Sequence, residues 1–198
     1  PPYGPVFVSL PIDVMEQETT NGPIAPGRLY RASEPDPRGV ADAASLLAAA
    51  RAPVIVVGDD VGRAGATAEL VQLAERIGAP VWFEGIRGHV SFPGAHPLAR
   101  SGVPFDAAAI RKVLAGADLV LIVGGAFFEE VWFTAGSPFP DGARVVQIES
   151  SARPLAYNHA PDVGLVAEPG AALHALDALV ASVADDAWRA GAAERNAR

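Results

Sequence analysis

The 198-residue chain contains no cysteine. This absence excludes disulfide frameworks, thiolate zinc sites and cysteine nucleophiles, so burial of apolar side chains must hold the fold together. No apolar run approaches the roughly 18 residues that a helix needs to cross a bilayer. The first residues also lack the charged and apolar regions of a signal peptide. We therefore expect a cytoplasmic protein without a membrane segment.

Charged residues are scarce as well, at 19% of the chain against 50% hydrophobic residues. This ratio excludes a disordered polymer and is sufficient for one well-filled core. Fifteen basic and twenty-three acidic residues give a net charge of -8. Such an acidic balance does not favour a nucleic acid or an anionic membrane surface as a partner.

Methionine is nearly absent, because Met15 is the only one, and the chain begins with Pro1. We therefore expect a piece of a longer polypeptide. Residues 4–14 alternate apolar and polar side chains, which is typical of a strand. Residues 16–39 lose this periodicity and contain several prolines, which is typical of a linker. The single lysine, Lys112, among many arginines hints at a GC-rich bacterial source.

From residue 40 onward, helix-like and strand-like segments alternate. The pattern predicts helices over residues 41–51 and 64–77, a helix capped by Asp106 and a last helix that starts at Pro169. It predicts strands over residues 54–57, 80–84, 118–123, 144–148 and 163–166. Continuously apolar strands between helices indicate an α/β fold, a three-layer Rossmann-like doubly wound sheet that is mainly parallel, with helices on both faces.

Ligands of such sheets bind outside the carboxyl ends of the strands. Gly58 opens a glycine-rich turn there, in the place of a dinucleotide phosphate loop, although its glycines fall four and three residues apart where the fingerprint has two and three. An ordinary tight turn is the alternative. Glu149 ends a strand, where an acid can accept hydrogen bonds from ribose hydroxyls. A solvated carboxylate or a helix cap is the alternative for Glu149.

The remaining polar and aromatic groups predict no catalytic residue and no metal site. The histidines show no ligand spacing, and we expect His96 to fix the long irregular stretch 85–105 by hydrogen bonds. Glu129 and Glu130 are expected to face water. The aromatic side chains around them predict an apolar patch suited to a partner or a pocket; they are Phe127, Phe128, Trp132, Phe133 and Phe139.

Four segments follow one another along the chain. They are GPVFVSLPIDV at residues 4–14, RAPVIVVGDDVGRAGATAELVQLAERIGAPVW at 51–82, SFPGAHPL at 91–98 and ADLVLIVGG at 117–125. In this order they resemble the thiamine-diphosphate-dependent superfamily of acetolactate synthase, pyruvate oxidase and benzoylformate decarboxylase. The resemblance implies four parts: residues 1–15, the terminal strand of a preceding pyrimidine-binding domain; 16–39, a linker; 40–184, the central domain; and 185–198, the start of a following linker.

The resemblance implies a parent enzyme that makes or breaks a carbon–carbon bond next to a carbonyl, either a 2-oxo-acid decarboxylase or an acetolactate-synthase-like enzyme. Thiamine diphosphate and magnesium would lie between the missing pyrimidine-binding and diphosphate-binding domains, so this chain is expected to be catalytically incomplete. Residues 85–105 and 124–133 would lie at the periphery of the active site. The parent is expected to be a homodimer or homotetramer. Val131 occupies the position of an active-site histidine of benzoylformate decarboxylases, so the resemblance selects neither activity.

Some central domains of this superfamily hold FAD or ADP. The resemblance makes Gly58, Gly124, Gly125 and Glu149 candidates for a nucleotide-type site. Ala126 stands where flavin-containing acetolactate synthases typically have an arginine, which argues against FAD and leaves an ADP-type site open. A free-standing FAD- or ADP-binding Rossmann-like module is one alternative for the whole chain, and a pure interaction domain is another.

Overall fold

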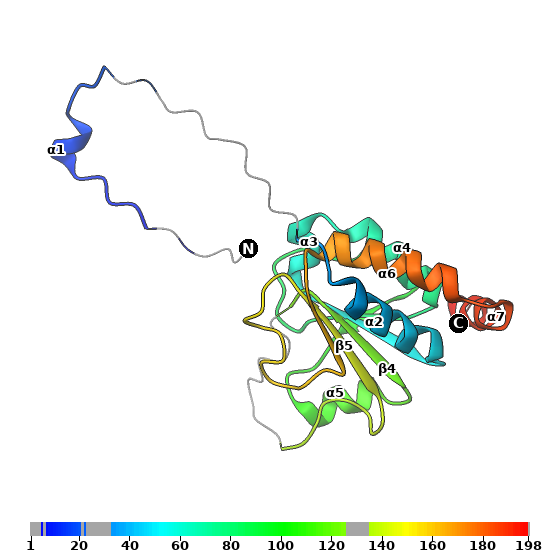
Figure 1. Ribbon diagram of the computed structural model, residues 1–198. Coiled ribbons are helices and arrows are strands. Elements are labelled where there is room, and N and C mark those ends of the chain that lie inside the picture. The colour runs from blue at the N-terminus through cyan, green and yellow to red at the C-terminus, as the bar shows by residue number, and fades with distance from the viewer. Residues whose placement is uncertain (1–4, 6, 21, 23–32, 126–134, 198) are drawn as a thin grey trace.

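The computed structural model describes residues 5, 7–20, 22, 33–125 and 135–197. Its centre is a six-stranded sheet in the order β3-β2-β1-β4-β5-β6, in which every neighbouring pair is parallel (Figure 1). The strands are β1 Pro53–Val57, β2 Val81–Phe83, β3 Ala99–Gly102, β4 Leu119–Val123, β5 Arg144–Glu149 and β6 Val163–Val166. The parallel α/β fold that the sequence predicts is confirmed.

Seven helices accompany the sheet in the described ranges. They are α1 Ile12–Met15, α2 Pro37–Ala49, α3 Asp59–Ala64, α4 Thr67–Ile77, α5 Ala107–Val113, α6 Pro169–Val183 and α7 Asp186–Asn196. None of these helices combines the length and the apolar character needed to span a bilayer.

Successive side chains of the central strands divide between two cores. In β4, Leu119, Leu121 and Val123 belong to the core beneath α2, α4 and α6, whereas Val120 and Ile122 belong to the core beneath α5 (Figure 1). A strand with helices on both faces has no solvated side, which favours apolar side chains at every position. This burial explains the unbroken apolar runs of β1 and β4.

Two helices differ from the sequence prediction. The first helix of the domain begins at Pro37, inside the predicted linker, because proline suits the first helical turn and Asp36 accepts a hydrogen bond from the N–H of Arg38 at 2.9 Å. The predicted helix 64–77 begins only at Thr67, as α4, and the predicted glycine-rich turn before it contains α3, which ends where Gly65 adopts a left-handed φ of 70°. The buried stripe of α4 is as predicted: Leu70, Leu73, Ala74 and Ile77.

The predicted irregular stretch 85–105 contains strand β3. Its Ala-Arg-Ser-Gly sequence has no apolar pattern because β3 lies at the edge of the sheet and its side chains are half-buried or exposed. His96 fixes this stretch as predicted, since its Nδ1 accepts the N–H of Leu98 at 3.2 Å and its Nε2 lies 3.1 Å from Oε1 of Glu75. The ring of Phe92 also packs edge-on against His96, with 5.0 Å between the centroids.

The two terminal parts differ from the predicted strand and linker. The described residues from 7 to 15 contain helix α1 and no strand, and apolar side chains such as Phe7 and Ile12 are exposed. A strand forms only against a partner strand, and no described segment pairs with these residues. Their assignment to a preceding domain stays a prediction. At the other end, the predicted linker 185–198 contains helix α7.

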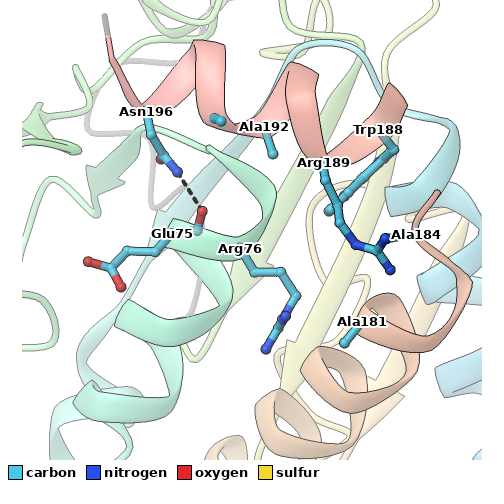
Figure 2. A pocket seen from close by; sticks show the side chains of 9 residues that line it. Glu75, Arg76, Ala181, Ala184, Trp188, Arg189, Ala192 and Asn196 are labelled. Carbon is cyan, nitrogen blue, oxygen red and sulfur yellow. Dashed lines mark hydrogen bonds between the residues drawn. The ribbon is translucent and has the colours of Figure 1, made fainter. Parts of the chain in front are cut away.

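Helix α7 is bound to the end of α4 by two side chains, of which Figure 2 shows Asn196. Arg195 donates from Nη2 and Nε to the carbonyl oxygen of Ile77, at 2.8 and 3.2 Å. Asn196 donates from Nδ2 to the carbonyl oxygen of Glu75 at 2.7 Å. The last carbonyl groups of a helix have no partner within that helix. At the end of α4 the side chains of α7 add to the N–H of Gly78, which donates to the carbonyl oxygen of Glu75.

A cavity of about 240 Å³ remains between α4, α6 and α7 (Figure 2). Its lining consists of Glu75, Arg76, Ala181, Ala184, Trp188, Arg189, Ala192, Ala193 and Asn196. Both cations of this lining already have acidic partners, since Arg76 binds the buried Asp177 of α6 and Arg189 binds Asp186. The rest of the lining is largely alanine, which offers few polar groups to a ligand.

We expect Arg195→Ala to lower the free energy of unfolding by about 1–2 kcal/mol, because it removes charged hydrogen bonds to the carbonyl oxygens of Ile77, at the end of α4, and of Arg51. Arg189→Ala is the matched control, since it changes the same residue type in the same helix but removes only an exposed ion pair. Urea denaturation measures both variants. Equal stability of the two variants would contradict the role given to Arg195.

Candidate functional site

The carboxyl ends of β1 and β4 meet where the strand order reverses, since β2 follows on one side of β1 and β4 lies on the other. In doubly wound sheets a ligand typically binds at this reversal. All four residues predicted for a nucleotide-type site lie here: Gly58 follows β1, Gly124 and Gly125 follow β4, and Glu149 ends β5. We call these four residues the strand-end junction.

The three glycines of the junction pack backbone against backbone. A Cβ on Gly58 would lie 2.4 Å from the carbonyl oxygen of Gly124 and 2.5 Å from Cα of Gly125. Gly124 has a left-handed φ of 68°, which favours glycine. The N–H of Gly58 donates to the carbonyl of Val123, and the N–H of Gly124 donates to the carbonyl of Ile148, both at 2.9 Å. The ends of β1, β4 and β5 are thus in direct backbone contact.

Glu149 is fully buried beneath this contact. Its Oε1 accepts a hydrogen bond from Nε2 of Gln147 at 3.0 Å, and its carboxylate also accepts the N–H of Gly125. Its Oε2 has no hydrogen-bond partner among the described residues. Burial, together with the nearby carboxylates of Asp60 and Glu84, raises the pKa of Glu149 to about 7. The folded chain therefore holds the proton of Glu149 more tightly than an ordinary glutamate does.

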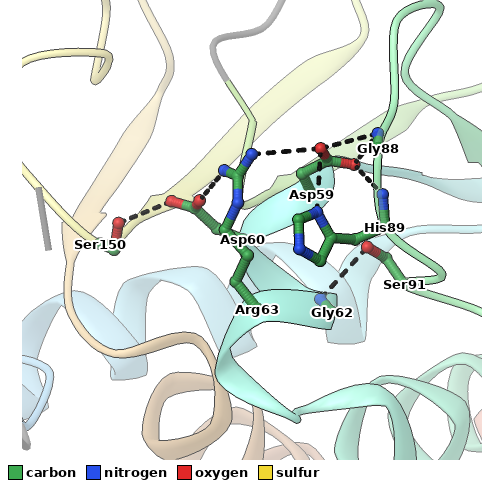
Figure 3. Close-up of polar contacts among 8 residues, drawn as sticks. All are labelled: Asp59, Asp60, Gly62, Arg63, Gly88, His89, Ser91 and Ser150. Carbon is green, nitrogen blue, oxygen red and sulfur yellow. Dashed lines mark hydrogen bonds and ion pairs between the residues drawn. The ribbon is translucent and has the colours of Figure 1, made fainter. Parts of the chain in front are cut away.

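Asp60 connects helix α3 to the ends of two strands (Figure 3). Its Oδ2 accepts a hydrogen bond from the hydroxyl of Ser150 at 2.6 Å, and its N–H donates to the carbonyl of Gly124 at 2.8 Å. Arg63 donates from Nη1 to Oδ1 of Asp60 at 2.9 Å and from Nη2 to Oδ2 of Asp59 at 3.2 Å. The guanidinium of Arg63 therefore compensates two adjacent carboxylates.

Asp59 fixes the segment that follows β2 (Figure 3). Its Oδ2 accepts the N–H of Gly88 at 2.8 Å, and its Oδ1 accepts the N–H of His89 at 3.1 Å. Ser91 adds a second connection, because its Oγ accepts the N–H of Gly62 at 3.2 Å. Burial raises the pKa of Asp59, but the N–H groups of Gly88 and His89 outweigh it, so the pKa lies below its usual value.

The polar groups of the junction do not fit a pyrophosphate. Oε2 of Glu84 would lie 2.7 Å from a Cβ on Gly125, and the carboxyl groups of Asp60 and Glu149 are close by. These acids would repel the charges of a phosphate. Groups of three or more histidine, aspartate or glutamate side chains able to hold a metal ion are also absent from the described part of the chain. The nucleotide role of the junction residues stays a prediction.

Three residues around Glu149 were not predicted as site residues: Glu84, Gln147 and Ser150. Gln147 carried a signal, because a polar side chain within an otherwise apolar strand needs a hydrogen-bond partner. The contact of Asp59 with His89 joins residues 30 positions apart and left no local pattern in the sequence. The contact between Asp59 and His89 depends on the arrangement of the strands in the sheet.

Several predicted features lie outside the described residues. These are Ala126, the paired acids Glu129 and Glu130, Val131, and the aromatic side chains of Phe127, Phe128, Trp132 and Phe133. Phe139 is described and is buried in the core beneath α5. Its ring contacts His159 edge-on, with 5.5 Å between the centroids, so Phe139 serves packing within the domain.

We expect Gly58→Ala to lower the free energy of unfolding by about 3 kcal/mol or more, because the new methyl group would collide with the backbone of Gly124 and Gly125, and relief of the collision would break the hydrogen bonds of this turn. Gly94→Ala is the control, since a Cβ on Gly94 has no described neighbour within 4 Å. Urea denaturation of both variants measures the difference. A Gly58→Ala protein as stable as Gly94→Ala would contradict the backbone contact.

The buried carboxyl group of Glu149 should make the stability of the folded chain depend on pH. Its pKa is about 7 in the folded chain against an ordinary 4.5, so the folded chain binds the proton more tightly. The free energy of unfolding should therefore fall by about 3 kcal/mol as the pH rises from about 4.5 to about 7, and Glu149→Gln should lack this fall. Denaturant titrations of both proteins from pH 5 to pH 8 measure it. A constant difference between them would refute the buried, proton-binding carboxyl.

Comparisons with known proteins match this fold. The family model described as thiamine pyrophosphate enzyme, central domain, covers residues 40–176. The benzoylformate decarboxylase of Pseudomonas aeruginosa is 33% identical over 175 residues, which is 85% of this chain and 33% of that protein. The acetolactate synthase of Arthrospira platensis is 30% identical over 178 residues, which is 83% of this chain and 30% of that protein.

Solved structures agree with the sequence relatives. The X-ray structure of a thiamin diphosphate-dependent enzyme from Mycobacterium smegmatis has a TM-score of 0.73 at 31% identity and covers 83% of this chain and 31% of that chain. The chain thus spans about a third of the length of the relatives that it matches. With a family match over most of its length, the chain belongs to the thiamine pyrophosphate enzyme family and corresponds to its central domain.

Proposed function

We propose that this chain is the central part of a longer thiamine-diphosphate-dependent enzyme that makes or breaks a carbon–carbon bond beside the carbonyl of a 2-oxo acid. The family match over residues 40–176 carries this proposal. A benzoylformate decarboxylase and an acetolactate synthase are similar to the chain to nearly the same degree, at 33% and 30% identity. The shared substrate class, a 2-oxo acid, is therefore the level at which the proposal is made.

In the parent, thiamine diphosphate with magnesium would supply the nucleophilic carbon for this chemistry. We propose that the cofactor and metal are held by the pyrimidine-binding and diphosphate-binding domains on either side of this chain, in a cytoplasmic homodimer or homotetramer. Residues 40–184 would act as a scaffold that docks these domains, with residues 1–15 as a strand of the preceding one. The chain by itself would then be inactive. The family match does not favour a free-standing FAD- or ADP-binding module.

The contacts of Asp59 support the scaffold role. Two backbone N–H groups bind its carboxylate, and together with Ser91 they fix the segment after β2 to helix α3. On this segment Ile86 and Val90 remain 61% and 76% exposed although both are apolar. Fixed apolar side chains on a surface are typical of an interface with another protein segment. We infer that residues 85–105 lie at the periphery of the parent's active site, and that residues 124–133 join them there.

The test compares the 198-residue chain with the parent polypeptide. Isothermal titration with thiamine diphosphate and magnesium should show saturable binding to the parent and none to the chain. Carbon dioxide release from benzoylformate and from pyruvate should likewise occur with the parent alone. Micromolar cofactor binding or turnover by the chain would contradict the scaffold role, and a parent that binds no thiamine diphosphate would contradict the proposed activity.

A further inference from the structure

Glu149 brings to the junction a carboxyl group whose negative charge no described residue compensates. The side chain is fully buried, and its Oε2 lacks a hydrogen-bond partner in the described part of the chain. The charged groups that face it are Asp60 from α3 and Glu84 from the end of β2, and both are acids. Arg63, which contacts this cluster, binds Asp60 and Asp59. A proton on Glu149 therefore neutralises the charge of its carboxylate without any further residue or ligand.

The turn that covers Glu149 lies just beyond the last residue of β4. Three backbone hydrogen bonds hold its two glycines. Gly125 donates its N–H to the carboxylate of Glu149, while Gly124 accepts the N–H of Asp60 at 2.8 Å and donates its own N–H to the carbonyl oxygen of Ile148 at 2.9 Å. Loss of these contacts would bring water to the carboxyl group. The backbone freedom of two successive glycines makes such a local opening cheaper than global unfolding.

We propose that the strand-end junction is a proton-operated latch: a proton on Glu149 keeps the Gly124–Gly125 turn closed over the end of β5, and loss of this proton lets the turn open locally. The energetic reason is that an ionised carboxylate is costly when it is buried beside two other acids, and opening restores its hydration. This inference goes beyond the proposed function and does not depend on it, because every contact it uses lies within this chain.

The direction of the pH effect follows from the two states of the turn. In the open turn Glu149 is hydrated and its pKa has the ordinary value of 4.5, whereas in the closed turn the pKa is about 7. The closed turn therefore binds the proton more tightly, so the ratio of open to closed molecules rises with pH between these values and is level above them. The expected rise is roughly tenfold per pH unit.

Amide hydrogen exchange of the 198-residue chain, followed by NMR from pH 5 to pH 8 and corrected for the intrinsic exchange rate, tests the latch. The amides of Gly124 and Gly125 should lose protection roughly tenfold per pH unit up to pH 7 and no further. The amide of Ile55, which donates to the carbonyl of Pro80 between β1 and β2, should show no such loss and serves as the internal reference.

Two variants separate the latch from general loosening of the fold. Glu149→Gln should make the protection of Gly124 and Gly125 independent of pH. Glu194→Gln, which changes an exposed glutamate of α7, should behave as the unchanged chain does. Constant protection of the two glycines in the unchanged chain would overturn the proposal, and so would a pH slope that persists in Glu149→Gln.

A carboxyl titration keeps the proposal testable if Glu149→Gln does not fold. The ¹³C signal of the Glu149 side-chain carboxyl in the unchanged chain should titrate with a midpoint near pH 7. Asp60→Asn should move this midpoint to lower pH, since it removes one of the two facing acids. A midpoint at the ordinary value for glutamate, or one that Asp60→Asn leaves in place, would refute the latch.

Discussion

The direct backbone contact of Gly58 with Gly124 and Gly125 is the constraint on which the rest of the site depends. Because no side chain separates the ends of β1 and β4, the residues that follow these strands are brought against one another and against the end of β5. Asp60 can then reach Ser150, and Glu149 is covered by Gly125. A larger residue at any of the three glycine positions would separate these groups.

This contact also explains why a Rossmann-like sheet here has an acidic junction where related architectures hold phosphates. The space beside Gly58 is filled by the backbone of Gly124 and Gly125, and the nearby polar groups are the carboxyl groups of Asp60, Glu84 and Glu149. The fold of a dinucleotide-binding domain is thus retained without the charge pattern that anion binding needs. The proposed scaffold role would depend on the rigidity of this sheet.

The sequence predicts most of the fold because burial on two faces leaves a plain pattern. The apolar runs of β1 and β4 can only be strands covered by helices, and they are so in the structure. The polar edge strand β3 has no such pattern, and neither has α7, whose single fully buried residue is Ala192. Pro37 lies in a proline-rich stretch that the sequence predicts to be a linker. In the structure Pro37 is the first residue of helix α2, which Asp36 caps.

The position of the site could be predicted from the sequence, whereas the burial and the hydrogen bonds of its residues could not. Sequence order alone places Gly58, Gly124, Gly125 and Glu149 at one edge of a parallel sheet, and the structure brings all four together. The complete burial of Glu149 was not foreseen, because an acid at the end of a strand is ordinarily solvated. Its burial follows from the close approach of Gly125 and from the amide of Gln147, which are properties of the packed sheet.

The most direct test of the account is an experimental structure of the parent polypeptide with thiamine diphosphate and magnesium bound. The account predicts that the cofactor and metal contact residues outside 40–184, and that the glycines of the strand-end junction remain in contact with one another. Cofactor or nucleotide phosphates seated against Gly58 and Gly124 would contradict it.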